Sequence, residues 1–220
     1  MGGVAAKYKV AGCNCQWGRS VVLIWLDFFG VFVFAVSGAL AADRRGMDLF
    51  GFVVIALLPA VGGGTVRDLM LGVPVFWVQD PTYLWLILAA ALLTFGAARQ
   101  IERVERWLLW ADAVGLSVFC VAGAAKAFAL TQSPEVSVAM GVVTAVLGGI
   151  IRDTVCNEIP LVLRQDIYAT AAFAGALSLV LLLETGVPQP VALWTGAAVC
   201  FGVRASALIW GWSLPRRRAP

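Results

Sequence analysis

The sequence predicts an all-α membrane protein with seven transmembrane helices, arranged as two inverted three-helix repeats followed by a seventh helix. Three observations lead to this fold class. The 220 residues are 61% hydrophobic and 13% charged, whereas soluble domains carry about a quarter charged residues. The mean hydropathy of +0.89 indicates that lipid is the main solvent. Finally, one set of residues occurs twice along the chain at a constant spacing.

Seven apolar stretches follow one another, each of roughly the 20 residues that cross a bilayer. Charged or proline-containing segments separate them, so the connections are short and leave no room for a second domain. The first stretch ends in small residues that resemble a signal-peptide cleavage site, but Asp27 lies early in it and the segment recurs later, which favours a mature helix. The expected spans are Val21–Ala42, Asp48–Gly64, Tyr83–Ala98, Leu108–Leu130, Val136–Cys156, Ile167–Leu183 and Val191–Trp212.

The first three spans and the next three share residues at a constant offset of 85 positions. The matched pairs are Asp27 and Asp112, Phe34 and Phe119, Gly38-Ala39 and Gly123-Ala124, Gly63-Gly64 and Gly148-Gly149, Arg67-Asp68 and Arg152-Asp153, and Tyr83 and Tyr168. Because three is odd, the second unit enters the membrane from the opposite side, so the two units are inverted. We therefore expect an N-terminal extension at 1–20, a first repeat at 21–106, a second repeat at 107–190, and a seventh helix with a basic tail at 191–220.

Residue usage excludes several classes of function. The chain has no histidine, so it has no Ser-His-Asp triad and no His-ligated zinc site. No two of its five cysteines form a CxxC pair, and their scatter through apolar segments indicates small buried side chains. A net charge of +3 is too small to indicate nucleic-acid binding. We expect no enzymatic reaction, no metal and no cofactor, with membrane lipids as partners.

The basic residues in the loops predict the orientation of the chain. Seven crossings place the two termini on opposite sides of the membrane. The N-terminal side holds three basic residues, Lys7, Lys9 and Arg19, whereas the C-terminal side holds nine. We expect a multi-pass protein of the cell (inner) membrane with a cytoplasmic C-terminus and an N-terminus outside.

Glycine runs in the second span of each repeat are the first candidate site. They are Gly62-Gly63-Gly64 and Gly148-Gly149. Such runs weaken a helix and free backbone carbonyls, and irregular backbone at membrane depth is found beside protein or a water-filled cavity. We expect broken helices along an ion path, where these carbonyls and the hydroxyls of Ser37, Thr65 and Thr144 replace ion hydration. The alternative is that the glycines only let helices pack closely.

An Arg-Asp dipeptide follows each glycine run, as Arg67-Asp68 and as Arg152-Asp153. Adjacent residues on a helix point about 100° apart and so are poorly placed to pair with each other. The inverted repeat suggests reciprocal pairs instead, Arg67 with Asp153 and Arg152 with Asp68, each neutralising a buried charge. Such pairs would form a gate, a structural clasp that holds the fold, or both.

Other charged residues lie inside the apolar spans. Lys126, at the position that matches Ala41, either snorkels to the interface or is pore-facing and sensitive to voltage. Asp27 and Asp112 begin matching spans, so we interpret them as N-terminal caps first and as ion ligands second. Arg204, in the seventh span, is expected to pair with an acid or a lipid phosphate rather than to line the path.

These residues resemble the TRIC family, the trimeric intracellular cation channels, in its prokaryotic branch. The matching features are the two glycine runs followed by Arg-Asp, the seventh helix, and the openings Asp27…Gly38-Ala39 and Asp112…Gly123-Ala124, so that the resemblance covers roughly residues 21 to 212. It implies a homotrimer in which each subunit holds its own pore, bent at glycine kinks of the second and fifth helices and permeable to monovalent cations, chiefly potassium. It also implies that Lys126 matches basic residues tied to gating on the family's fourth helix.

Two further classes of function fit the same features. An inverted repeat with broken helices also suits a secondary transporter of a small solute such as an amino acid, whose carboxylate would be held at half-helix amino ends. Saturable, coupled uptake would distinguish it from a channel, which gives ohmic single-channel steps. A membrane scaffold or lipid-binding subunit is the third class. It predicts that neutralising Arg67 or Asp153 harms assembly without altering any flux.

Overall fold

The computed structural model describes residues 21–98, 104–164 and 167–211, and all regular structure within these ranges is α-helical. The long helices are α1 (Val21–Arg44), α2 (Leu49–Met70), α4 (Thr82–Ala98), α5 (Val104–Thr131), α6 (Pro134–Val155), α8 (Ala169–Glu184) and α9 (Gln189–Trp210). Two four-residue helices, α3 (Phe76–Gln79) and α7 (Leu161–Arg164), follow α2 and α6. The expected N-terminal extension at 1–20 and the basic tail lie outside the described residues.

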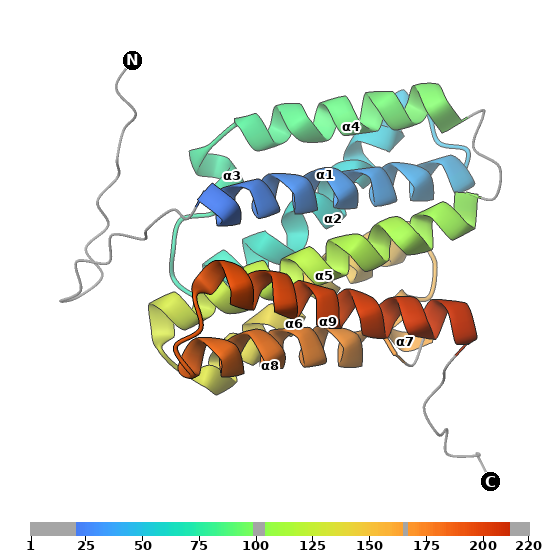
Figure 1. Cartoon of the computed structure of the whole chain (residues 1–220). Helices are drawn as coiled ribbons and strands as arrows, with labels where there is room; N and C mark the ends of the chain where they lie inside the picture. The colour runs from blue at the N-terminus through green and yellow to red at the C-terminus, as the bar shows by residue number, and fades with distance from the viewer. Residues whose placement is uncertain (1–20, 99–103, 165–166, 212–220) are drawn as a thin grey trace, which may run out of the picture.

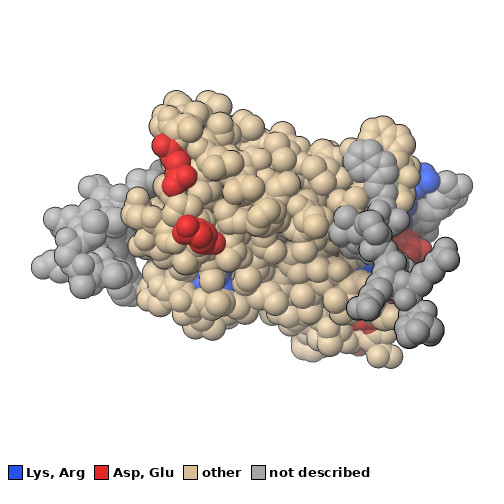
Figure 2. Space-filling view, turned by 90° about the horizontal axis from the view of Figure 1, so that it is seen from below, with Lys and Arg blue, Asp and Glu red and all other residues tan. Residues whose placement is uncertain are grey.

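Each of the seven predicted apolar stretches forms a helix. Five of the described helices, α1, α2, α5, α6 and α9, are long and apolar enough to cross a membrane. The helices α4 and α8 have only 17 and 16 residues, which corresponds to about 25 Å at 1.5 Å per residue. Figure 2 shows one face of the molecule, on which charged side chains lie mainly at the two ends. The chain is therefore a multi-pass helical membrane protein.

The helices of the two halves meet in equivalent pairs. α1 packs against α5, and α2 packs against α6. Phe34 and Phe119 occupy the same position in the two repeats. Their rings stack with the centroids 5.1 Å apart. α3 and α7 lie at opposite ends of the bundle, and α1 begins at the end opposite to that at which α9 finishes (Figure 1). Helices at matching repeat positions therefore pack against each other, and the two short helices lie at opposite ends of the bundle (Figure 1).

The caps of the long helices differ from the prediction. Asp48 caps α2 by accepting a 2.8 Å hydrogen bond from Gly51 N, and Ser133 caps α6. Asp27 and Asp112 lie inside α1 and α5, beyond the first turn of each helix. The expectation that they are N-terminal caps is therefore wrong, because both helices begin several residues before the aspartate.

Candidate functional site

The crossing of α2 and α6 is the centre of the candidate site. Both helices are continuous through their glycine runs, so the expected helix breaks are absent from the described α2 and α6. A methyl carbon added at Gly63 would collide with the Thr144 carbonyl oxygen, and one added at Gly148 would lie 2.5 Å from the Pro59 carbonyl oxygen. Because Pro59 and Thr144 occupy the same repeat position, the two contacts are equivalent. Here the glycines serve close helix packing, as the alternative interpretation predicted.

The other glycines of the two runs face side chains rather than backbone. Added methyl carbons at Gly62 and Gly64 would lie 2.8 Å from Ile151 Cδ1 and 2.6 Å from Phe76 Cε1. A methyl carbon at Gly149 would lie 3.0 Å from the Tyr168 hydroxyl. Each of these positions thus has a close neighbour that a larger side chain would displace.

The first charge cluster, which we call the Asp68 cluster, lies at the end of α2 that leads to α3. Asp68 is fully buried. Its Oδ1 accepts hydrogen bonds from Arg67 Nε at 2.8 Å and from Lys126 Nζ at 2.7 Å. Its Oδ2 accepts a 3.0 Å bond from the backbone N–H of Phe76, whose ring also lies under the Arg67 guanidinium. One carboxylate therefore joins α2, α3 and α5.

The second charge cluster, which we call the Arg152 cluster, lies at the end of α6 that leads to α7. Arg152 is fully buried. It pairs with Asp153 at 2.8 Å and, through Nη1, with Asp112 on α5 at 2.8 Å. Nη1 also donates to the Ser37 hydroxyl on α1. Asp153 Oδ2 accepts a 2.9 Å bond from the backbone N–H of Leu161, so this cluster joins α1, α5, α6 and α7.

The predicted reciprocal pairs of Arg67 with Asp153 and of Arg152 with Asp68 are wrong. Each arginine instead pairs with the aspartate that follows it in the sequence. The reason is geometric, because α2 and α6 run in opposite directions and their C-terminal ends lie at opposite ends of the bundle (Figure 1). The long arginine side chain curls back to its neighbour, and this freedom is ignored when only helical angles are considered.

The two clusters share the backbone N–H group that bonds to the aspartate but differ in their other charged residues. Phe76 and Leu161, which bond to the aspartates through their N–H groups, occupy matching repeat positions. Lys126 belongs only to the first cluster, because its counterpart in the first repeat is Ala41. The Lys126 side chain is 20% exposed, whereas that of Arg152 is fully buried. The second cluster is thus the more enclosed of the two.

Three hydroxyls that the sequence singled out are all engaged by other protein groups. Ser37 accepts from Arg152, as described. Thr65 Oγ1 donates to the Val61 carbonyl at 2.7 Å and accepts from Trp77 Nε1 at 3.0 Å. Thr144 Oγ1 donates to the Met140 carbonyl at 2.6 Å. Thr65 and Thr144 lie on α2 and α6 close to the crossing, and Ser37 lies in the Arg152 cluster.

The role of Phe76 in the Asp68 cluster was not predicted from the sequence, and Tyr168 was found there only as a repeat match. Tyr168 is buried, and the guanidinium of Arg204 lies 4.9 Å from its ring centroid. Arg204 also donates a 3.0 Å hydrogen bond to the Ile167 carbonyl. The signal for Tyr168 in the sequence is its spacing from Arg152-Asp153, which equals that of Tyr83 from Arg67-Asp68 in the first repeat.

A surface ion-pair group joins the two repeats near the Arg152 cluster. Arg44 and Arg45, at the end of α1, lie 3.3 and 3.1 Å from the Glu158 carboxylate in the segment after α6. Arg45 also donates to the Asn157 carbonyl. We call this group the Glu158 clasp.

Comparison with known proteins identifies the family. A family model described as "Glycine transporter" matches residues 24–99 and 109–184, two segments of equal length displaced by the same 85 residues as the internal repeat. The solved structure of the TRIC trimeric intracellular cation channel orthologue from Rhodobacter sphaeroides is 48% identical, with a TM-score of 0.85 over 87% of this chain and 100% of that chain. The chain belongs to the TRIC family.

Other relatives support the assignment to the TRIC family. A prokaryotic TRIC channel solved in 0.5 M KCl is 28% identical, with a TM-score of 0.83 over 88% of this chain and 99% of that chain. The UPF0126 inner membrane protein YadS of Escherichia coli K12 is 44% identical over 89% of this chain and 96% of its own length. These relatives are channels and membrane proteins, so this TRIC-family chain is not an enzyme.

Proposed function

We propose that this chain forms a potassium-permeable cation channel of the inner membrane, as a homotrimer with one pore inside each subunit. The observation that carries the proposal is the 48% identity, over 87% of the chain, to a protein described as a trimeric intracellular cation channel. The inner-membrane location is supported by the E. coli relative, which is an inner membrane protein. In this proposal α4 and α8 also cross the bilayer, which gives seven spans.

The proposed pore follows the crossing of α2 and α6. Support comes from the position of this crossing between the two repeats and from the buried charge clusters at its two ends. In the conformation described, the continuous helices use their carbonyls in their own hydrogen-bond ladders. Bending at Gly62-Gly63-Gly64 and Gly148-Gly149 would release some of these oxygens towards potassium. We propose this bend as the opening motion.

Local charge balance makes a cation path between the clusters feasible. Three basic residues would otherwise repel potassium, namely Arg67, Arg152 and Lys126. Asp68 is shared by Arg67 and Lys126, and Asp27 lies close enough to interact electrostatically with both cations. Asp112 and Asp153 together offset Arg152. Opposite charges at these distances neutralise much of the field that a passing ion meets.

A secondary transporter of a small solute such as an amino acid is the second candidate, because two matching halves that pack against each other also suit that class. Planar-bilayer recording of the purified protein in asymmetric potassium chloride separates the two. The channel proposal predicts discrete current steps that reverse near the potassium equilibrium potential. Absence of steps from folded, trimeric protein, together with saturable uptake of glycine into proteoliposomes, would contradict it and support the transporter.

A matched pair of variants tests the proposed route of the ions. Gly63→Ala places a methyl group against the Thr144 carbonyl, whereas Gly202→Ala on α9 has open space around the added carbon. We expect the first variant to change single-channel conductance or open probability and the second to leave both unchanged. Equal behaviour of the two variants would exclude a pore at the α2–α6 crossing.

A further inference from the structure

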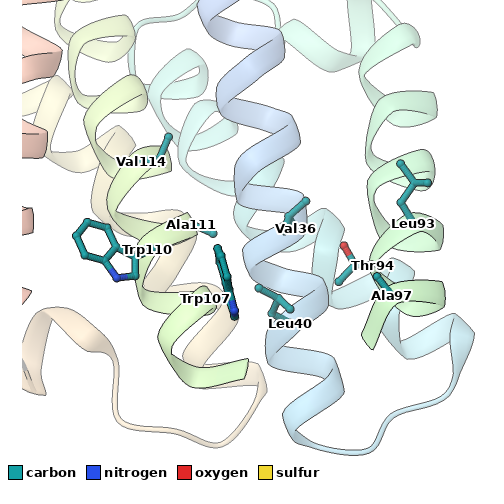
Figure 3. Close-up of a pocket in the computed structure, with 9 residues that line it drawn as sticks. All are labelled: Val36, Leu40, Leu93, Thr94, Ala97, Trp107, Trp110, Ala111 and Val114. Atoms are coloured by element: carbon teal, nitrogen blue, oxygen red, sulfur yellow. The ribbon is translucent and has the colours of Figure 1, made fainter. Parts of the chain in front are cut away.

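A groove on the side of the bundle lies between α1, α4 and α5 (Figure 3). Its volume is about 460 Å³, and its walls include Val36, Leu93 and Ala111. The one wall hydroxyl, that of Thr94, donates to the Ala90 carbonyl of its own helix. The indole of Trp107 stands between α5 and α1 (Figure 3) and is 60% exposed. The groove therefore offers mainly apolar surface to an occupant.

The internal repeat shows that the equivalent position on the second repeat is filled by α9. The positions that match Val36 and Thr94 in the second repeat are Val121 and Leu179. There α9 packs so closely that a methyl carbon added at Gly196 would lie 3.0 and 3.1 Å from these two side chains. α9 has no counterpart in the first repeat. The groove on the first repeat is thus the one of the two equivalent positions that α9 leaves uncovered.

A second hollow of about 460 Å³ adjoins the groove at the N-terminal end of α5. Trp110 lines both spaces, and in Figure 3 its ring points to the other side of α5 from Trp107. Glu105 and Arg106 lie at this second hollow, both exposed. None of the ion pairs formed within 21–98, 104–164 and 167–211 uses either side chain. One cation and one anion thus line the second hollow, which shares Trp110 with the apolar groove.

We propose that the two hollows together bind one phospholipid with a zwitterionic amino-phosphate headgroup, a property beyond ion conduction. An acyl chain lies in the groove, where it covers the surface that α9 covers on the other repeat. The Arg106 guanidinium donates to the phosphate, as its planar fork of N–H groups favours. The Glu105 carboxylate accepts from the lipid ammonium. An anionic lipid without an ammonium would place a negative headgroup beside Glu105, so the charge pattern selects the zwitterion.

The test is native mass spectrometry of the delipidated full-length protein, titrated with phosphatidylethanolamine or phosphatidylglycerol of identical acyl chains. We expect a three- to fivefold preference for phosphatidylethanolamine, roughly the size of one exposed charge contact. Glu105→Gln should abolish the preference. Arg106→Gln should weaken the binding of both lipids, each by about three- to fivefold. Arg164→Gln, an exposed arginine of α7, is the matched control and should change neither.

Filling the groove tests the acyl-chain contact separately. Ala111→Phe should reduce retention of phosphatidylethanolamine, whereas Ala198→Phe on the exposed side of α9 should not. Equal retention of both lipids by the unaltered protein, with no effect of Glu105→Gln or Arg106→Gln, would overturn the proposal. So would an Ala111→Phe variant that separates into monomers while each chain retains its lipid, because the groove would then be a subunit contact. None of these readouts depends on ion flux.

Discussion

Arg152 is a fully buried arginine that neutralises two buried carboxylates. It is fully enclosed, and it pairs with both Asp112 and Asp153. Removing one partner of a buried ion pair leaves an uncompensated charge and costs about 3–5 kcal/mol. We therefore expect Arg152→Ala to lower the unfolding free energy by about that amount, measured by thermal unfolding in detergent. Arg164→Ala, which removes an exposed arginine, should change it by less than about 0.5 kcal/mol. Equal melting temperatures for the two variants would contradict the burial argument.

Removal of the Lys126 side chain, unlike that of Arg152, should change channel gating more than thermal stability. Asp68 keeps two other donors, Arg67 Nε and the Phe76 N–H, when the ammonium is removed. Because the Lys126 side chain is also 20% exposed, we expect Lys126→Ala to cost only about 1 kcal/mol. If the cluster gates the proposed pore, the open probability should shift and its voltage dependence weaken. Bilayer recordings of Lys126→Ala beside Lys126→Arg check this, and unchanged gating in both would assign Lys126 a purely structural role.

Close packing of α2 against α6 predicts how a substitution at their crossing changes thermal stability. A methyl group at Gly63 meets backbone of α6, which cannot move aside as a flexible side chain does. Overpacking of this kind costs about 1–3 kcal/mol, so Gly63→Ala should lower thermal stability. Gly202→Ala, in open space on α9, should be neutral or stabilising by up to about 1 kcal/mol, because alanine favours helix. A stabilising effect of Gly63→Ala would show that the helices are not in contact there.

The same crossing shows how far the sequence predicts the elements. The lengths of the apolar stretches predicted every long helix of the described residues, and the constant offset of 85 residues recurs in the two segments that the family model matches. The continuity of α2 and α6 through their glycines was not predictable, because local propensity treats a glycine run as a break whereas packing against a neighbouring helix holds it helical. The pairing of Arg67 and Arg152 was missed for a related reason. Each arginine curls back to the adjacent aspartate, and the further partners Lys126 and Asp112 lie on α5, where no local pattern places them.

The Glu158 clasp joins the two halves of the molecule at one end. Arg44 and Arg45 share the single carboxylate, and all three side chains are partly exposed. Exposed pairs contribute about 0–1 kcal/mol, and salt screens them. We expect Glu158→Gln to lower thermal stability slightly in dilute buffer and to match the unaltered protein in about 1 M salt, where the screening length is about 3 Å. Unfolding curves at the two salt concentrations check this, and a deficit that persists in high salt would mean that the clasp acts through packing instead.

The orientation of the whole molecule follows from the odd number of proposed spans and from the distribution of basic residues. α1 begins and α9 ends at opposite ends of the bundle (Figure 1). The C-terminal side carries nine basic loop residues against three on the other, and an excess of lysine and arginine marks the cytoplasmic side. A protease-cleavable tag at the C-terminus should thus be cut in inside-out membrane vesicles only, and a tag at the N-terminus in spheroplasts only. Cleavage of both tags in both preparations would mean that the chain inserts in two orientations, and the reverse pattern would contradict the orientation that the basic loops predict.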